Sequence, residues 1–360
     1  MKHRGNQYLK GVVFLLALFP AIAALSACFS PWRGDTGTFS ISFGSSGRAL
    51  LPWNHNVEIE EIEHVIKLSG GPGLDQTRTI TGAGTAEFIV VPGKWQITVE
   101  AYWKAPYYGP EAPREFVAYG TRSFDVKSGP NGPIRADMWQ VVKSTYELPD
   151  ALGPGASVLA LYAEYPDTWD IDYWSVVIDH PVTLIAISDV EIYRASAFND
   201  SFFAFSQGGS LTLQTVRGCT LTLNGSGVSG ANPLIDVDNG GKLFIYDGVR
   251  LVNNDAGTSS FGGAVRVTAG SFAMYGGTIA GNRALTGGGV YVTTGGTFTK
   301  TGGVIYGDDG SDDANIAINT GNAVYVAATT SPPPGRSTKK RDSTAGPGLH
   351  LNSETAANWE

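Results

Sequence analysis

In the second half of the chain, short stretches with an apolar residue at every second position alternate with glycine-rich turns. One copy of this pattern covers residues 262–282, and the next covers residues 288–307. Aligning the two copies pairs three apolar positions: Val265 with Val290, Phe272 with Phe298, and Ile279 with Ile305. Weaker copies lie on both sides, and each copy predicts three short strands.

Strands this short, at this regular spacing, predict stacked coils rather than hairpins. In a parallel β-helix each coil lies about 4.8 Å from the next, and like side chains stack in a narrow core. Glycines then occupy corners that need positive φ. We expect Asn254 and Asn282 to adopt the left-handed conformation at such corners and to hydrogen-bond along the stack. Residues 176–330 are therefore predicted to form a single-stranded right-handed parallel β-helix of about six coils.

The glycine-rich motifs Gly262-Gly263-Ala264-Val265 and Gly288-Gly289-Val290 resemble the repeats of polymorphic outer-membrane proteins and related β-helical bacterial surface lipoproteins. The likeness covers residues 176–326 and is strongest over 262–307. It departs from the family pattern where Leu251 and Ile279 stand in place of the aromatic residue of the "FxxN" motif. The resemblance implies a β-helix displayed at the cell surface for adhesion.

Residues 38–145 also alternate in the manner of strands. Residues 87–102 read as a strand, a Pro92-Gly93 turn and a second strand. This segment resembles a hairpin of transthyretin-like and immunoglobulin-like domains on bacterial surface proteins, which implies an N-terminal β-sandwich of about a hundred residues. Residues 58–68 fit either a strand or a short helix.

Residues 146–175 differ from both neighbours, because residues 148–152 and 156–162 are helix-like. A β-helix leaves an open apolar end with free strand edges, so this segment predicts a helical N-terminal cap. Residues 331–360 contain three consecutive prolines and the basic run Lys339-Lys340-Arg341. They predict a semi-ordered C-terminal tail with a solvated basic patch.

Residues 1–27 have the pattern of a signal peptide, in which a basic start precedes the uncharged, mostly apolar residues 11–25. Leu25-Ser26-Ala27-Cys28 resembles a lipobox, which implies that Cys28 becomes the acylated N-terminus and that residues 28–37 form a tether. The alternative is ordinary cleavage near Ala23 or Ala27, which would leave a free thiol. Phe29 in place of aspartate favours export to the outer membrane over retention at the inner membrane.

Composition narrows the possible partners. The net charge is −8 and the charged residues are scattered, so no nucleic-acid partner is expected. Besides Cys28 the sequence has one cysteine, Cys219, in an apolar strand context that favours a buried, inert thiol. His180 precedes Pro181 and has no evident catalytic partner. No cofactor is expected.

Polysaccharide lyases and hydrolases share the β-helix fold, so an enzymatic function is an alternative hypothesis. Their sites need clustered carboxylates, or Ca²⁺-binding aspartates with a basic residue. The sequence offers two groups, the acids Asp236, Asp238 and Asp247 and the bases Lys242, Arg250 and Arg266. Asp236 and Asp238 would share the outward face of one strand, and we interpret them as solvated positions. The sequence thus predicts a protein that is not an enzyme.

Two further groups are candidate binding residues. The acidic turn of Asp308, Asp309, Asp312 and Asp313 could hold Ca²⁺, but it matches neither the EF-hand spacing nor the GGxGxDxUx nonapeptide. A solvated turn is the preferred interpretation. Exposed aromatic residues could stack on sugars or bind a protein, and the candidates are Trp103, Tyr107, Tyr108 and Trp174.

Two functions remain open. The first is a lipid-anchored, non-catalytic protein of the outer membrane or cell surface, which displays the β-helix to a host protein, matrix protein or glycan. The second is a carbohydrate-active protein, either a lyase or hydrolase or a glycan-binding module. A groove lined by acidic and basic side chains would favour the second, and a smooth outer face of Thr, Ser and Gly would favour the first.

Overall fold

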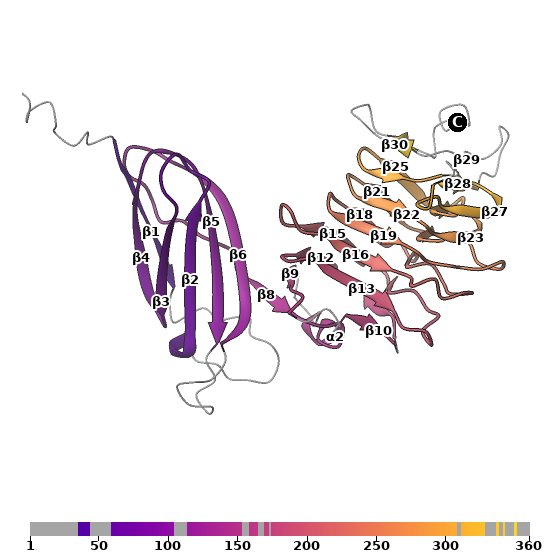
Figure 1. Ribbon diagram of the computed structural model, residues 1–360, viewed down its shortest axis with the longest axis horizontal. Helices are drawn as coiled ribbons and strands as arrows, with labels where there is room; N and C mark the ends of the chain where they lie inside the picture. The colour runs from indigo at the N-terminus through magenta and orange to yellow at the C-terminus, as the bar shows by residue number, and fades with distance from the viewer. Residues whose placement is uncertain are drawn as a thin grey trace, which may run out of the picture. The chain divides into compact units, whose positions relative to one another are not determined.

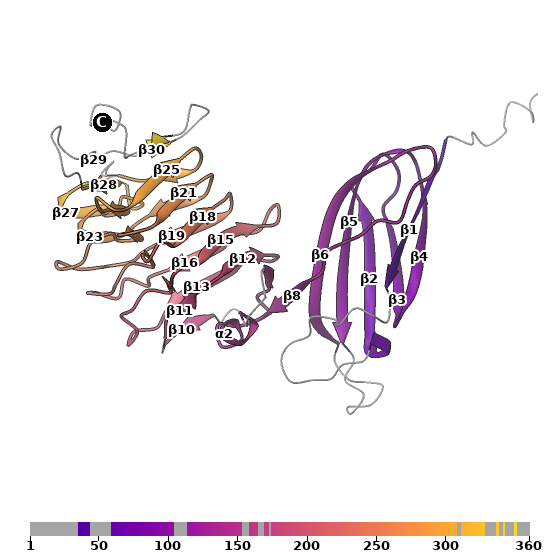
Figure 2. The same ribbon diagram turned by 180° about the vertical axis from the view of Figure 1, so that it is seen from behind.

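The computed structural model describes residues 35–43, 59–103, 114–152, 158–164, 169–172, 174–307 and 311–327, and three two-residue strands beyond them. The chain divides into two compact units, each described here by itself. The first comprises Met1–Gly47, Glu63–Val99 and Gly120–Asp137, and the second comprises Arg48–Ile62, Glu100–Tyr119 and Met138–Glu360. The described residues are almost entirely strand, which confirms the all-β prediction (Figures 1 and 2).

The first unit contains mainly antiparallel strands. β1 (Gly37–Phe43) pairs with β4 (Gly84–Val90), and its first two residues pair in parallel with β7 (Gly129–Pro130). β2 (Ile62–Ser69) pairs with β3 (Gln76–Thr81), and the turn η1 (Ile59–Glu61) precedes it. Of the ambiguous residues 58–68, the described residues 59–68 are thus a short 3-10 turn followed by a strand.

Alternation of buried and exposed residues in this unit produces a small aromatic core. Phe39 of β1 stacks on Phe88 of β4 with ring centroids 5.1 Å apart. Trp95 of β5 (Gly93–Trp103) is buried, and its indole N–H donates to the Val91 carbonyl at 2.9 Å. The other long strand is β6 (Glu115–Val126). These elements do not support the transthyretin- or immunoglobulin-like sandwich expected for residues 38–145. Among the described strands, β1 pairs with β4 along its whole length, and its other edge has only the two-residue β7, in parallel.

The second unit is a parallel β-helix with three faces, each built from six parallel strands. The first face contains β9 (Val158–Leu161), β12 (Pro181–Ala186), β15 (Ser210–Thr215), β18 (Lys242–Ile245), β21 (Ser271–Met274) and β25 (Thr297–Lys300). The second contains β10 (Asp170–Ile171), β13 (Val190–Arg194), β16 (Leu221–Asn224), β19 (Val249–Val252), β22 (Thr278–Ala280) and β26 (Val304–Ile305). The third contains β11 (Val176–Ile178), β14 (Phe203–Phe205), β17 (Ile235–Val237), β20 (Val265–Val267), β24 (Val290–Val292) and β28 (Val324–Val326).

Six strands on each face are separated by five steps, so the β-helix makes about five turns, where the sequence predicted about six coils. A separate pair of parallel strands, β23 (Arg283–Thr286) and β27 (Ile316–Thr320), lies in the connections of the later coils. The sequence repeat and the coil coincide, which confirms the predicted β-helix.

The register of the strands confirms the alignment of the repeats. Val265 pairs with Val290 and Val290 with Val324, while Phe272 pairs with Phe298 and Ile279 with Ile305. All of these side chains are buried. The Phe272 and Phe298 rings stack with centroids 4.8 Å apart and planes 26° apart, a separation close to the spacing between strands.

The predicted helical cap is not supported. Among the described residues of 146–175, only α2 (Leu148–Ala151) is helical, and residues 158–161, predicted to be helix-like, form β9. Leu159 and Leu161 are both buried and pair in parallel with β12, so packing in the core overrides their local helix preference. On the other edge of β9 lies another strand, β8 (Trp139–Val142).

The last coil is covered by strands from the C-terminal segment. β29 (Arg336–Ser337), β30 (Arg341–Asp342) and β31 (Leu349–His350) pair antiparallel with β28, β26 and β25, one on each face. Free strand edges invite pairing with other chains, and these short strands occupy the final edge of all three sheets.

Buried asparagines bond from coil to coil, as predicted. The backbone N–H of Asn254 donates to Oδ1 of Asn282 at 3.0 Å, and the backbone N–H of Asn282 donates to Oδ1 of Asn315 at 2.9 Å. Asn315 is a third member that the sequence analysis missed. The expected left-handed conformation at Asn254 and Asn282 is wrong: Asn253 has φ of 55°, and Asn254 instead turns its amide into the core, where Nδ2 donates to the Gly263 carbonyl.

The stacked core predicts a sharp contrast between neighbouring residues of β25. Phe298→Ala should lower the free energy of unfolding by about 3–5 kcal/mol, because it removes a buried ring and leaves a cavity. Thr297→Ala, at an exposed position of the same strand, should cost under about 0.5 kcal/mol. Denaturant melts of both variants test this, and equal small shifts would contradict the stacking of Phe298.

Candidate functional site

The residues predicted to bind ligands lie in different places. Trp103 is half-buried at the end of β5, and its indole N–H donates to Oε2 of Glu61 at 3.0 Å. Trp174 lies between β10 and β11 and is 47% exposed. Cys28, Tyr107, Tyr108, Asp308 and Asp309 lie outside the described residues.

The described part of the acidic turn is exposed. Asp312 and Asp313 both face solvent, and the backbone carbonyl of Asp313 accepts from the Gly281 N–H at 2.8 Å. Within the described ranges, no three His, Cys, Asp or Glu side chains converge in a way that could hold a metal ion.

A ladder of polar and aromatic residues follows the third face of the β-helix. Each strand there has three residues, of which the first and third are buried, so the middle residue faces outward. In register, these middle residues of the last four coils are Asp236, Arg266, Tyr291 and Tyr325. We call this set the third-face ladder.

Its polar half is a closed ion pair. Arg266 Nε donates to Asp236 Oδ1 at 2.9 Å, and Nη2 donates to Oδ2, so the contact is bidentate. The hydrogen bonds that Arg266 donates to Asp236 raise the pKa of the arginine, although burial opposes the rise. Both carboxylate oxygens of Asp236 are therefore engaged by Arg266.

Its aromatic half is a stack. The Tyr291 and Tyr325 rings are stacked, with centroids 5.4 Å apart and planes nearly parallel, at 4° to each other. Phe261, in the connection before β20, is 38% exposed and lies 4.8 Å from the Tyr291 ring. Burial raises the pKa of Tyr291, and the neighbouring Tyr325 adds to the rise.

Asp238, directly after β17, has an unusual environment for a carboxyl group. Burial is the main cause that raises the pKa of its carboxyl, and the charge of Asp236 contributes. One of its oxygens is buried without a hydrogen-bond partner among the described residues. A carboxyl with a raised pKa beside an arginine is a feature of some catalytic sites, which makes Asp238 the best argument for chemistry here.

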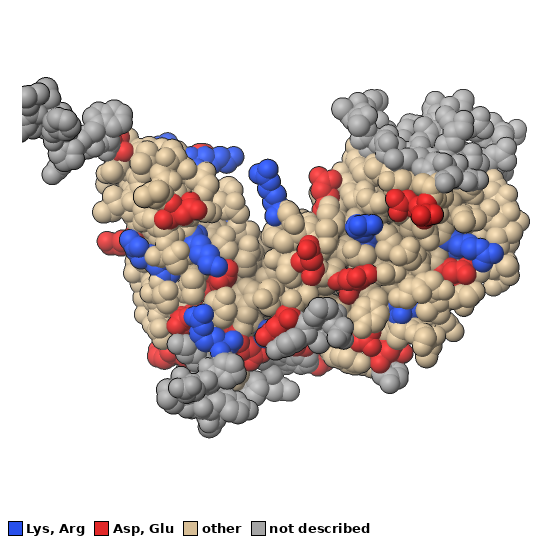
Figure 3. Space-filling model, viewed as in Figure 1, with Lys and Arg blue, Asp and Glu red and all other residues tan. Residues whose placement is uncertain are grey.

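The remaining polar candidates are structural or dispersed. His180 pairs with the adjacent Asp179, and Lys242 and Arg250 lie on the outward positions of two different faces. Cys219 is half-buried with its pKa raised by burial, which disfavours the reactive thiolate. On the face shown in Figure 3, acidic and basic side chains are interspersed.

Arg194 was missed, because nothing in the sequence shows that an arginine turns into the core. It is 2% exposed, and burial lowers its pKa to about 10. Its guanidinium lies over the Phe202 ring and donates to the carbonyls of Phe198, Asp200 and Asn232. These bonds satisfy most of its donors, so we interpret Arg194 as a structural residue that stabilises the connection between β13 and β14.

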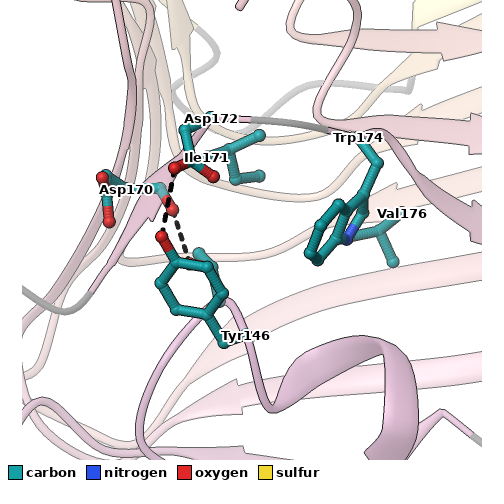
Figure 4. A pocket seen from close by; sticks show the side chains of 7 residues that line it. Tyr146, Asp170, Ile171, Asp172, Trp174 and Val176 are labelled. Carbon is teal, nitrogen blue, oxygen red and sulfur yellow. Dashed lines mark hydrogen bonds between the residues drawn. The ribbon is translucent and has the colours of Figure 1, made fainter.

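A shallow pocket surrounds Trp174 at the start of the β-helix (Figure 4). Its lining combines aromatic and acidic side chains with an aliphatic floor: Thr145, Tyr146, Asp170, Ile171, Asp172, Trp174 and Val176. The Tyr146 hydroxyl donates to Oδ2 of Asp172 at 3.1 Å. The hydroxyl of Thr145 donates to the backbone carbonyl of Asp170. Both bonds join the segment before α2 to β10 and the residue that follows it.

Comparison with known proteins gives no match: no family model, no curated protein and no solved structure is significantly similar to this chain. Among the described residues, no helix is long and apolar enough to cross a membrane.

Proposed function

We propose that the protein is a lipid-anchored, non-catalytic protein of the bacterial cell surface, which displays its β-helix to a host or matrix partner. The observation that carries this proposal is the third-face ladder, in which Arg266, Tyr291 and Tyr325 follow one another on successive coils beside Phe261. Arginine and tyrosine are enriched among residues that dominate binding energy at protein interfaces.

The rest of the outer surface supports binding over catalysis. Outward positions of the first face are mostly small or hydroxylated, as in Thr183, Thr212, Ala273 and Thr299. On the third face, Arg266 and Asp236 neutralise each other in a closed ion pair. A smooth face suits a broad, flat partner better than a single polysaccharide chain.

Anchoring depends on the lipobox resemblance of Leu25-Ser26-Ala27-Cys28. Acylation of Cys28, followed by a tether over residues 28–37, would place both units outside the membrane that holds the lipid. The hypothesis of a parallel β-helix related to the polymorphic outer-membrane proteins belongs to the same proposal, supported by the glycine-rich repeats.

The second candidate function is carbohydrate chemistry, favoured by one observation. Asp238 has a raised pKa and lies two residues from Asp236, which pairs with Arg266. A glycosidase of the usual kind needs two carboxyl groups on opposite sides of the bond it cleaves. The closed ion pair at Asp236 makes this the weaker candidate.

The anchor predicts a change of location. Cys28→Ser should abolish acylation, because serine has no thiol for the lipid, and should release the protein from the membrane fraction. Labelled palmitate and cell fractionation measure both effects. Equal label in wild type and Cys28→Ser would contradict the anchor.

The ladder predicts a change in binding. The full chain is tested on an array of matrix proteins and glycans, and binding to at least one of these is expected. Tyr291→Ala combined with Tyr325→Ala should weaken it by about 30-fold, the loss of roughly 2 kcal/mol typical of a dominant contact. Tyr275→Ala is the matched control, because Tyr275 is also exposed and stacked, on Tyr246, but lies outside the ladder.

Two outcomes of that experiment would contradict the proposal. The first is equal loss of binding in the Tyr275→Ala control. The second is degradation of a polysaccharide by wild type that disappears in Asp236→Asn or Asp238→Asn, which would make the protein an enzyme.

A further inference from the structure

The pocket beside Trp174 lies on different strands from the third-face ladder and needs its own explanation. Its working side chains come from three places along the chain: Tyr146 precedes α2, Asp170 and Asp172 are in and just after β10, and Trp174 precedes β11. Figure 4 shows the Tyr146 hydroxyl next to Asp172 and the Trp174 indole opposite them.

Two aromatic rings present their surfaces to solvent here. Tyr146 is 48% exposed and Trp174 is 47% exposed, an unusual degree for such large side chains. Their ring centroids are 6.4 Å apart, with 77° between the planes, so they enclose a corner rather than a flat stack. The face of an indole or phenol attracts a cation within about 6 Å of its centre.

Two carboxylates complete the corner. No described basic side chain forms an ion pair with Asp170 or Asp172. The bond from Tyr146 orients Asp172, and the bond from Thr145 holds the backbone of Asp170 without using its carboxylate. The corner therefore places negative charge beside two aromatic rings. The carboxylates and the ring faces both attract a cation.

We propose that this pocket binds a primary alkylammonium group, the chemistry shared by a lysine side chain and a free aliphatic amine. The cavity has a volume of about 10 Å³, which is room for about one water-sized group and so suits an ammonium head with its chain left in solvent. The carboxylates repel anions. A divalent cation would need six or more oxygens, more than this corner supplies.

This inference is independent of the lipid anchor and of the third-face ladder. A partner bound through the ladder and an ammonium bound at Trp174 can each exist without the other. Failure of one experiment therefore leaves the other proposal standing.

Fluorine NMR of the full chain tests the site directly. The chain has eight tryptophans, so it is labelled with 5-fluorotryptophan, and the resonance missing from Trp174→Phe identifies Trp174. The probes are n-butylammonium, putrescine and Nα-acetyl-lysine methylamide, with n-butanol as the uncharged match. We expect the Trp174 resonance to shift and saturate with a Kd on the order of 1 mM for the ammonium probes, and to stay in place with n-butanol.

A second experiment removes the negative charges of the pocket. Asp170→Asn with Asp172→Asn should weaken ammonium binding at least tenfold, while asparagine keeps an oxygen that can accept from Tyr146. Glu87→Gln, at an exposed position of β4, is the control for loss of a surface charge away from the pocket and should bind as wild type does. Stronger binding of the lysine derivative than of putrescine assigns the site to a protein partner, and the reverse order assigns it to a free amine.

Three results would overturn the proposal: an equal shift with n-butanol, unchanged affinity in the double asparagine variant with an intact spectrum, or no saturable shift with any ammonium probe. The unshifted resonances of the other tryptophans report whether each variant is folded.

Discussion

Contact between like side chains one strand spacing apart holds the β-helix together. Each coil has a core only a few side chains wide, and no coil can bury its apolar residues alone. Phe272 is buried because Phe298 covers it, and Val290 is buried between Val265 and Val324. Such positions must match from coil to coil, and this requirement fixes the register of the strands. The register in turn determines which side chains lie next to one another on the outer surface.

The same constraint governs polar groups inside the coil. A buried amide must find its partners in the coils above and below, and the chain Asn254, Asn282 and Asn315 meets this requirement. Arg194 meets it through backbone carbonyls. Outward-facing positions are free of this packing constraint, so their side chains are available to bind a ligand or a partner. The third-face ladder and the pocket beside Trp174 both consist of side chains that the core does not need.

The repeat made the central fold predictable, because Val265 and Val290, or Phe272 and Phe298, can be aligned without knowing any distance. The ladder was within reach of the same alignment: Val265-Arg266-Val267, Val290-Tyr291-Val292 and Val324-Tyr325-Val326 are equivalent triplets, and their middle residues must meet.

Other features depend on contacts that the sequence does not reveal. β9 has a helix-like sequence and becomes a strand only because β12 offers it an edge. The pocket brings Tyr146 next to Asp172 and Trp174 through the return of the chain at β10, which no repeat anticipates. The short strands of the C-terminal segment likewise owe their pairing to the open edges of the last coil.

In-register crosslinking tests the stacked, parallel coils most directly. Ala273 and Thr299 face outward as partners on β21 and β25. Neighbouring strands lie about 4.8 Å apart, within the span of a disulfide, so Ala273→Cys with Thr299→Cys should oxidise readily. Ala273→Cys with Thr297→Cys places the thiols two residues out of register, at about 8 Å, and should not crosslink. Equal oxidation of both pairs, or of neither, would contradict the parallel register on which this account depends.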